Sequence, residues 1–523
     1  MSDLPQNPTA VPSGKGDWSA RSLSLLALFT VFAFLLMGYH PGLEDDVFYL
    51  AAIKRNLNPS LFPHDTDFFR IHFQATIFDK LIAFSVRLSH LPLAWALLLW
   101  QLAAIFLILH GCWRISRRCF SDSAAQWAAV VLVASLLTLP VTGTGINLAD
   151  PYLHPRNLVI AAILAAVVNV LDRRTWRAGL WLAVAFSIHA IMAAFGISLC
   201  GFLLWKLMAS SRKRQFSIPG SVALAIPLGW MFERGSDAWH QAAATRSFYF
   251  LARWEWYEWL GVFAPIILLY AFHQWHRRRV SSAAEATLSM LTSSLVSYGI
   301  FQTVVGLAIM LPPSLERLRP FEPMRYLHLI YLFFFLIVGG LLGQYVLDRR
   351  VYRWLLLFVP ISAGMFYAQR QLYPATPHFE LPGAVPQNPW LQAFAWVRQN
   401  TPVDALFALD PHYMTLPGED YHGFRALAER SMLADYEKDG GMAARVPRLA
   451  PRWLKEVTAE TGWRSFQLAD FEGLKQQFGV NWVILSRSDA LVPNGIGMPA
   501  NSHGQADMTC PYQNQQVSVC RLY

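Results

Sequence analysis

Three consecutive carboxylates, Glu44, Asp45 and Asp46, follow the first long apolar stretch of the sequence, which ends near Tyr39. A carboxylate is costly inside hydrocarbon, so this triplet must lie at a membrane edge or in a polar cavity. There it could bind substrate, and an ionised member could orient a hydroxyl group or accept its proton. Repulsion among adjacent acids raises at least one pKa. For contact with the hydroxyl group, Asp46 is preferred over Asp45, because a helix beginning at Asp46 would direct its side chain along the membrane surface towards a central cavity. The alternative is a solvated acidic feature of the outer face.

Several later residues could bind a phosphorylated or sugar-bearing ligand. A guanidinium group matches phosphate oxygens with two parallel donors, and aromatic faces can stack on sugar rings. His189 is polar within an apolar run, so it lines a cavity or bonds to a neighbouring helix. Instead of binding a ligand, the arginines could lie at the membrane edge with their charged ends in water. The aromatic residues could likewise form an ordinary interfacial belt. The candidates are Arg156, His189, Arg246, Arg253, Trp256 and Arg325.

A metal site has weaker sequence support. His64, Asp65 and Asp67 lie near the acidic triplet and offer imidazole and carboxylate ligands for a divalent metal ion. No compact metal motif such as HExxH accompanies them. Gly-rich phosphate loops, a dinucleotide-binding fingerprint and a nucleophile elbow are also absent from the sequence, which argues against an enzyme that uses nucleotide sugars from the cytosol.

The composition places these residues in a polytopic α-helical membrane protein. Of 523 residues, 54% are hydrophobic and 15% are charged, and the mean hydropathy is +0.31. One soluble core could not bury so much apolar surface. The net charge of +9 comes from basic clusters between apolar runs. This distribution is typical of topology signals, so no nucleic-acid site is expected.

About eleven apolar segments are near the length of a membrane span. Arginine clusters at 114–118, 173–177, 212–214, 277–279 and 349–353 fall in alternate loops. By the positive-inside rule, the N-terminus is cytoplasmic and residues after 370 are outside. Residues 1–20 are expected to be disordered and residues 21–369 to form the membrane domain. The segments are 21–39, 91–111, 124–140, 157–171, 176–189, 190–209, 217–232, 256–273, 285–311, 326–347 and 351–368.

Two regions outside the membrane have their own structure. The first outer loop, 40–90, predicts an amphipathic helix from Val47 to Leu57 on the membrane surface and a second from about 68 to 88. Residues 370–523 predict a small α/β domain after a proline-rich linker, with helices at 389–399, 453–458 and 468–478 and strands at 405–409, 480–486 and 517–523. Cys510 and Cys520 are spaced to close a hairpin with a disulfide in an oxidising compartment.

The whole architecture resembles the GT-C superfamily of membrane glycosyltransferases. The shared features are the acidic residues after the first span, the helical outer loop, about eleven spans and a terminal outer α/β domain. More specifically, the sequence is similar to bacterial membrane proteins that share a DxxxYL first loop with LNPSLFPHD (57–65), and WVRQNTPVDALF (396–407) with later FR (424–425) and ER (429–430) pairs. The superfamily resemblance implies a polyprenyl-phosphate sugar donor, a first-loop aspartate as general base at Asp45 or Asp46, and assistance by a second-loop acid at Asp150.

The sequence therefore predicts a glycosyltransferase of the bacterial inner membrane that transfers a sugar to a periplasmic or lipid acceptor. Its partners would be membrane lipids and the lipid-linked donor, with a divalent ion as an open question. Two alternatives are a transporter or flippase, in which the same acids bind substrate or protons, and a non-catalytic scaffold that tolerates Asn at Asp45 and Asp46. The sequence leaves the sugar, the acceptor and the oligomeric state open.

Overall fold

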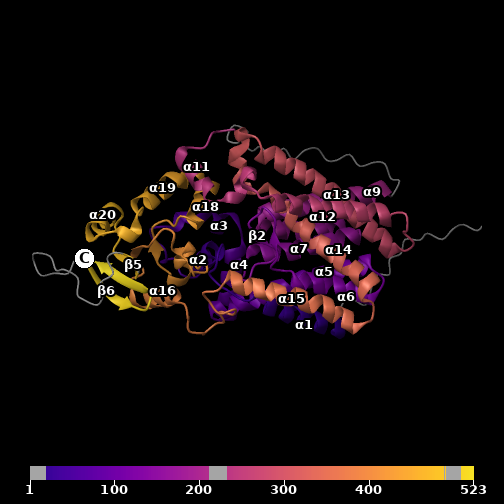
Figure 1. Ribbon diagram of the computed structural model, residues 1–523, viewed down its shortest axis with the longest axis horizontal. Helices are drawn as coiled ribbons and strands as arrows, with labels where there is room; N and C mark the ends of the chain where they lie inside the picture. Colours follow the sequence, from indigo (N-terminus) through magenta and orange to yellow (C-terminus); the bar gives the residue numbers. More distant parts are fainter. Residues whose placement is uncertain (1–18, 211–231, 488, 490–507) are drawn as a thin grey trace, which may run out of the picture.

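The computed structural model describes residues 19–210, 232–487, 489 and 508–523. A long helical body occupies one part of the molecule, and a C-terminal region containing a sheet occupies the other (Figure 1). Six helical stretches are long and apolar enough to cross a membrane: Ala20–Met37, Leu93–Cys119, Ala190–Ala209, Ala283–Met310, Pro323–Leu347 and Val351–Leu372. The chain is therefore a multi-pass membrane protein.

Helices coincide with ten of the eleven apolar segments. The eleventh, 217–232, lies almost entirely outside the described residues, as does the N-terminal segment expected to be disordered. Some helices are short for a span, so the count of eleven stays a prediction. The helices are α1 (Ala20–Met37), α5 (Leu93–Cys119), α6 (Ser123–Ser135), α7 (Pro155–Leu171), α8 (Thr175–Ile188), α9 (Ala190–Ser210), α12 (Trp256–His276), α13 (Ala283–Met310), α14 (Leu327–Leu342) and α15 (Val351–Leu372).

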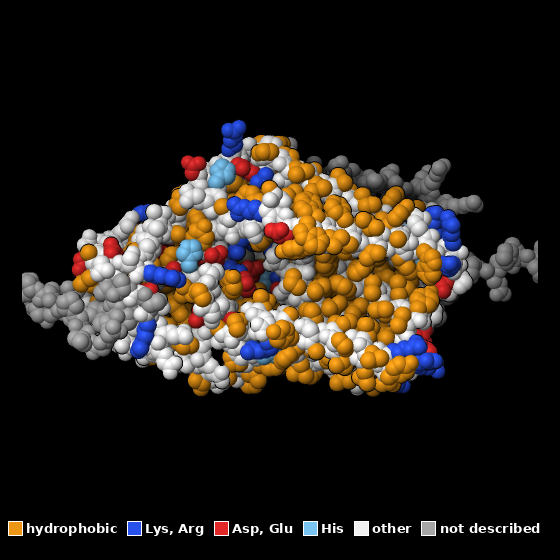
Figure 2. Space-filling view, in the orientation of Figure 1, with side chains coloured by type: hydrophobic (Ala, Val, Ile, Leu, Met, Phe, Trp, Pro, Cys, Tyr) orange, Lys and Arg blue, Asp and Glu red, His pale blue; other side chains and the backbone are white. Residues whose placement is uncertain are grey.

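Polar residues set the ends of several of these helices. The side chain of Asp122 accepts a hydrogen bond from the N–H of Ala125 at the start of α6. Ser282 and Glu285 form a reciprocal capping box at the start of α13. Within the body, α7 is buried along most of its length and packs against α5, α8 and α9. The outward faces of the body are apolar, as expected of a surface in contact with lipid (Figure 2).

The arginine clusters within the described residues lie at helix ends away from the C-terminal region. Figure 2 shows Lys and Arg side chains gathered at that end of the helical body. There, Arg118 at the end of α5 forms an ion pair with Asp172 after α7, with Nε and Oδ1 2.6 Å apart. This placement is consistent with the alternating topology predicted from the basic loops.

The first outer loop forms α2 (Asp46–Leu57), α3 (Arg70–Ala75) and α4 (Phe78–Ser89). The helix expected from Val47 to Leu57 is present, but it is enclosed by other parts of the protein along most of its length. Residues 46–53 of α2 are all buried, because the helix packs against α4 on one side and the C-terminal region on another. The second expected helix is divided into α3 and α4.

The C-terminal region contains a five-stranded sheet of order β4-β3-β5-β7-β6. The strands β4, β3 and β5 are parallel, whereas β7 runs antiparallel to β5 and β6. Cys510 and Cys520 form a disulfide between β6 and β7. The strands are β3 (Leu406–Ala408), β4 (Ser431–Met432), β5 (Trp482–Ser486), β6 (Met508–Gln513) and β7 (Val517–Leu522). The helices are α16 (Pro389–Asn400), α17 (Phe424–Ala428), α18 (Lys438–Arg445), α19 (Ala450–Ala459) and α20 (Leu468–Phe478).

Backbone contacts join the segment between α1 and α2 to the C-terminal region. Tyr39 forms a β-bridge with Phe379, and Leu43 forms one with His422. The N–H of Glu44 donates to the carbonyl oxygen of Tyr421 at 3.1 Å. The acidic triplet is therefore held between the helical body and the C-terminal region.

Candidate functional site

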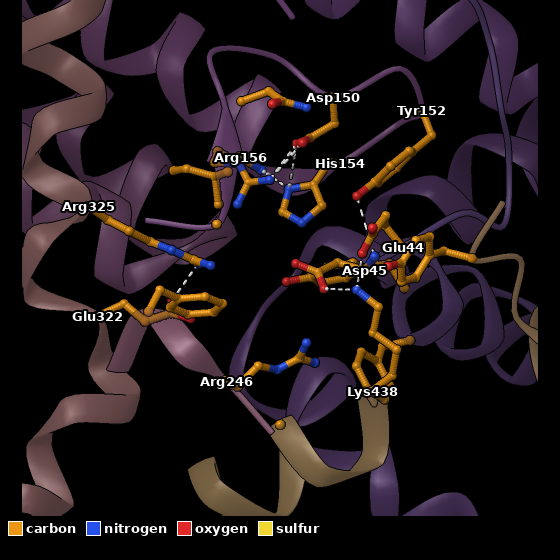
Figure 3. A pocket seen from close by; sticks show the side chains of 18 of the residues that line it. Glu44, Asp45, Asp150, Tyr152, His154, Arg156, Arg246, Glu322, Arg325 and Lys438 are labelled. Atoms are coloured by element: carbon orange, nitrogen blue, oxygen red, sulfur yellow. Dashed lines mark hydrogen bonds and ion pairs between the residues drawn. The ribbon is translucent and has the colours of Figure 1, made fainter. Parts of the chain in front are cut away.

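A cavity of about 410 Å³ lies between the helical body and the C-terminal region. In Figure 2 acidic and basic side chains are visible in the hollow between these two parts. Its charged and histidine residues come from six separate segments, and Figure 3 shows several of these side chains converging on one space. The charged or polar lining residues include Glu44, Asp45, Asp150, Tyr152, His154, Arg156, His189, Arg246, Glu322, Arg325, Glu437, Lys438 and Arg445.

Asp45 is the first-loop aspartate that faces the cavity. Lys438 of α18 forms ion pairs with both Glu44 and Asp45, and its Nζ lies 3.1 Å from Oδ1 of Asp45. Burial alone would raise the pKa of Asp45, but the positive charges of Lys438 and Arg156, together with His154, hold it well below its usual range. Asp45 is therefore ionised at neutral pH. It can accept a hydrogen bond from a ligand hydroxyl group.

The preference for Asp46 is corrected by the structure. Its side chain does not line the cavity but turns back, and Oδ2 accepts a hydrogen bond from the N–H of Gly42 at 2.7 Å. The side chain is 2% exposed, and this burial is the main reason that its pKa is raised to about 7. The expected raised pKa within the triplet is thus found at Asp46, and its main cause is burial rather than repulsion between the three acids. The carboxylate at the cavity is Asp45.

Asp150 and Arg156 form a buried ion pair on the opposite wall. Nη2 of Arg156 lies 2.8 and 2.7 Å from the two carboxylate oxygens of Asp150. Asp150 is therefore occupied by Arg156, and it is available to a ligand only if that pair opens. Nε and Nη1 of Arg156 have no hydrogen-bond partner among the described residues. Arg156 can thus keep its ion pair and still donate to an anion in the cavity.

Two further arginines contribute donors on the same side. Arg325 pairs with Glu322, which also binds Arg445 of α18, with Nη2 and Oε1 3.1 Å apart. Nε of Arg325 has no partner among the described residues. Arg246 lies between this group and Lys438 (Figure 3), and its side chain makes no ion pair or hydrogen bond with the part of the chain that the structure describes. Three arginines that line the cavity, Arg156, Arg246 and Arg325, therefore keep guanidinium donors without a partner among the described residues.

The remaining predicted site residues divide into two groups. His189 lines the cavity at the break between α8 and α9. Arg253 and Trp256 do not: Arg253 lies over the ring of Phe250, and Trp256 is 73% exposed on the outside of α12. Both residues therefore lie outside this cavity, and Trp256 fits the interfacial aromatic belt.

The three metal-ligand candidates are directed to separate partners. Asp65 is buried in an ion pair with Arg425, whereas His64 contacts the backbone carbonyl of Asp404. Asp67 is half exposed, 3.0 Å from Nη2 of Arg70. Within the described residues, no group of three or more His, Cys, Asp or Glu side chains is arranged to hold a metal ion. These three residues therefore do not form the expected cluster.

Sequence reasoning missed the contribution of α18. Glu437, Lys438 and Arg445 line the cavity, and Lys438 contacts both acids of the first loop. No spacing or motif indicates this contact, because it joins residues that are almost 400 positions apart. Tyr152 and His154 also line the cavity and follow Asp150 by two and four residues, which could have brought them into the prediction.

The fold and the cavity define a class: a multi-pass membrane protein with a charged cavity between its helices and a C-terminal sheet region. Residues 388–445 match the family model described as Domain of unknown function (DUF6798). The matched segment runs from α16 through α18 and includes Lys438 and Arg445 of the cavity. Comparison with curated proteins gave no match.

Proposed function

We propose that the protein is a membrane glycosyltransferase that transfers a sugar from a polyprenyl-phosphate donor to a hydroxyl group of a periplasmic or lipid acceptor. The observation that carries the proposal is the shared cavity of Asp45 and three guanidinium groups with unused donors, those of Arg156, Arg246 and Arg325. An ionised carboxylate can accept a hydrogen bond from the acceptor hydroxyl group, and the guanidinium groups can donate hydrogen bonds to the phosphate oxygens. The membrane helices beside the cavity would accommodate the polyprenyl chain.

In the proposed reaction, the acceptor oxygen forms a bond to the anomeric carbon of the sugar as the bond from that carbon to the donor phosphate breaks. The phosphate departs with the bonding electrons, and the arginines stabilise its charge. Asp45 orients the hydroxyl group and receives its proton only as the new bond forms and makes that proton strongly acidic, because the pKa of Asp45 is held well below its usual range. Because Lys438 is bonded to Asp45, the acceptor would lie on the side of the carboxylate left open to the cavity.

The test is a transfer assay on the purified full chain in lipid nanodiscs, with a panel of radiolabelled polyprenyl-phosphate sugars. Both sugar transfer and donor hydrolysis are measured for the wild type, Asp45→Asn and Asp46→Asn. We expect Asp45→Asn to lower the rate at least ~100-fold, the usual range for loss of a general base. Asp46→Asn should retain activity within a few-fold, because Asp46 lies outside the cavity. Full activity in Asp45→Asn would overturn the role of Asp45.

Donor binding is measured separately, so that catalysis and recognition are distinguished. Arg246→Gln should weaken binding of the polyprenyl phosphate, because this arginine has no competing ion pair among the described residues. Arg253→Gln is the matched control, since Arg253 belongs to the same loop but lies outside the cavity. Equal binding by both variants and the wild type would contradict the assignment of the phosphate to this wall.

A further inference from the structure

Helix α2 borders two different cavities. Asp45, Phe48 and Tyr49 line the charged cavity, whereas Leu50 and Lys54 line a different cavity of about 360 Å³. These two sets lie on opposite sides of the helix, as expected from a repeat of 3.6 residues. An occupant of the second cavity would therefore contact the same helix that follows Asp45.

The second cavity lies where three parts of the chain meet. Its lining includes Leu93 and Leu97 at the start of α5, residues 377–387 of the linker after α15, and Leu391 of α16. Most of the lining is apolar. Because α5 is a membrane-spanning helix that begins here, the cavity lies at the level where hydrocarbon gives way to lipid headgroups. The chain thus provides an apolar cavity at a membrane boundary.

One wall of this cavity holds its two cations, Lys54 and Arg398, whose formal charges are balanced by the carboxylates of Glu429 and Glu380. Nζ of Lys54 lies 2.7 Å from Oε1 of Glu429, and Nη1 of Arg398 lies 3.8 Å from the same oxygen. Two cations therefore share one carboxylate. The other lining carboxylate, Glu380, is engaged by His40 and His422, at 2.8 and 3.0 Å. Arg398 is 44% exposed, so its guanidinium group is accessible to a headgroup.

We propose that this cavity binds an anionic lipid of the surrounding membrane. Its acyl chain packs against Leu93, Leu97 and Leu391, and its headgroup lies beside Lys54 and Arg398. An apolar cavity at a membrane boundary, with the half-exposed guanidinium group of Arg398 paired only at 3.8 Å, matches both ends of such a molecule. The bound lipid bridges α5, α2 and the C-terminal region. It therefore stabilises the arrangement that forms the charged cavity, whether or not the protein is a transferase.

The test measures lipid binding to the delipidated full chain in detergent, by native mass spectrometry and by thermal unfolding. Phosphatidylglycerol is compared with phosphatidylcholine of the same acyl chains, and inorganic phosphate is a third arm. We expect phosphatidylglycerol to bind roughly fivefold more tightly than phosphatidylcholine. It should also raise the melting temperature by at least ~3 °C at saturation. Inorganic phosphate alone should have no effect.

Two variants separate the headgroup from the acyl chain. Arg398→Glu reverses the exposed charge, and Ala395→Trp fills the cavity without changing charge; both should lose the stabilisation by phosphatidylglycerol. Arg464→Gln is the control, an exposed arginine of the same region that does not line the cavity. Equal effects of the two lipids, or full stabilisation of both variants, would overturn the proposal. An effect of inorganic phosphate alone would overturn the requirement for a lipid.

Discussion

At the scale of single residues, Asp46 gives the protein a specific pH dependence. Its pKa is raised from 3.8 to about 7 in the folded protein, chiefly by burial. At pH values between these two pKa values, the Asp46 carboxyl group is ionised in the unfolded chain and protonated in the folded chain. Its contribution to stability is thus fully present below about pH 4 and falls by up to about 4 kcal/mol as the pH rises through 7.

Asp46→Asn should remove this contribution while keeping an acceptor for the N–H of Gly42. The variant should therefore be more stable than the wild type at pH 8, and the difference should shrink towards pH 4.5. Chemical unfolding of both proteins in detergent at the two pH values measures this. A stability difference that does not change with pH would show that Asp46 is not the titrating group.

A second residue-scale prediction concerns Arg425, which is surrounded by buried carboxylates. It pairs with Asp65 and lies 2.8 Å from Asp439 and 3.8 Å from Asp435. Arg425→Met would leave these acids without a buried cation, so the free energy of unfolding should fall by about 3–5 kcal/mol. Arg452→Met is the control, because this arginine also pairs with acids but is 36% exposed. Arg452→Met should lower the free energy of unfolding by less than about 1 kcal/mol. If both variants lose the same free energy of unfolding, burial of the carboxylates around Arg425 is not the cause.

At the scale of elements, the segment before α2 depends on close contact with α17. Gly42 has a φ of +82°, and an added Cβ would lie 2.8 Å from Cδ2 of Leu427. Gly383 in the linker has a similar φ of +86° but open space around it. Gly383→Ala should therefore lower the free energy of unfolding by only about 1 kcal/mol, the cost of holding alanine in the left-handed backbone conformation.

Gly42→Ala adds a steric clash to that backbone cost and should be clearly less stable than Gly383→Ala. It should also make the linker at 374–387 more sensitive to protease, because the segment holding it is displaced. Melting temperatures and limited proteolysis of the two variants measure the difference. If the two glycine variants behave alike, the contact with Leu427 does not hold this junction.

The same elements show what local sequence can predict. Helix α20 coincides with the predicted 468–478, since its apolar spacing and Gly479 define it locally. The burial of α2 could not be predicted, because its outer faces are covered by residues from distant parts of the chain. For the same reason Asp45 and Arg156 were found as candidates, whereas Lys438 was not. Residue type identified the groups suited to the chemistry, but only tertiary contacts determined which of them meet.

At the scale of the whole molecule, the arrangement makes a prediction about topology. Arg349 lies just before α15, and α15 runs along the helical body and leads to the C-terminal region (Figure 1). If α15 crosses the membrane, residues before and after it lie on opposite sides. The basic residues beside Arg349 indicate that its side is cytoplasmic.

Cysteine substitution tests this directly, because the three free cysteines within the described residues are buried. Glu472→Cys in α20 should react with a membrane-impermeant maleimide on intact spheroplasts, whereas Arg349→Cys should react only after permeabilisation. Both positions are exposed, so accessibility in the folded protein does not separate them. Labelling of Arg349→Cys from outside would reverse the orientation and place the charged cavity on the cytoplasmic face. A lipid-linked donor in the outer leaflet could not then reach Asp45, so this measurement also tests the compartment in which the proposed transfer occurs.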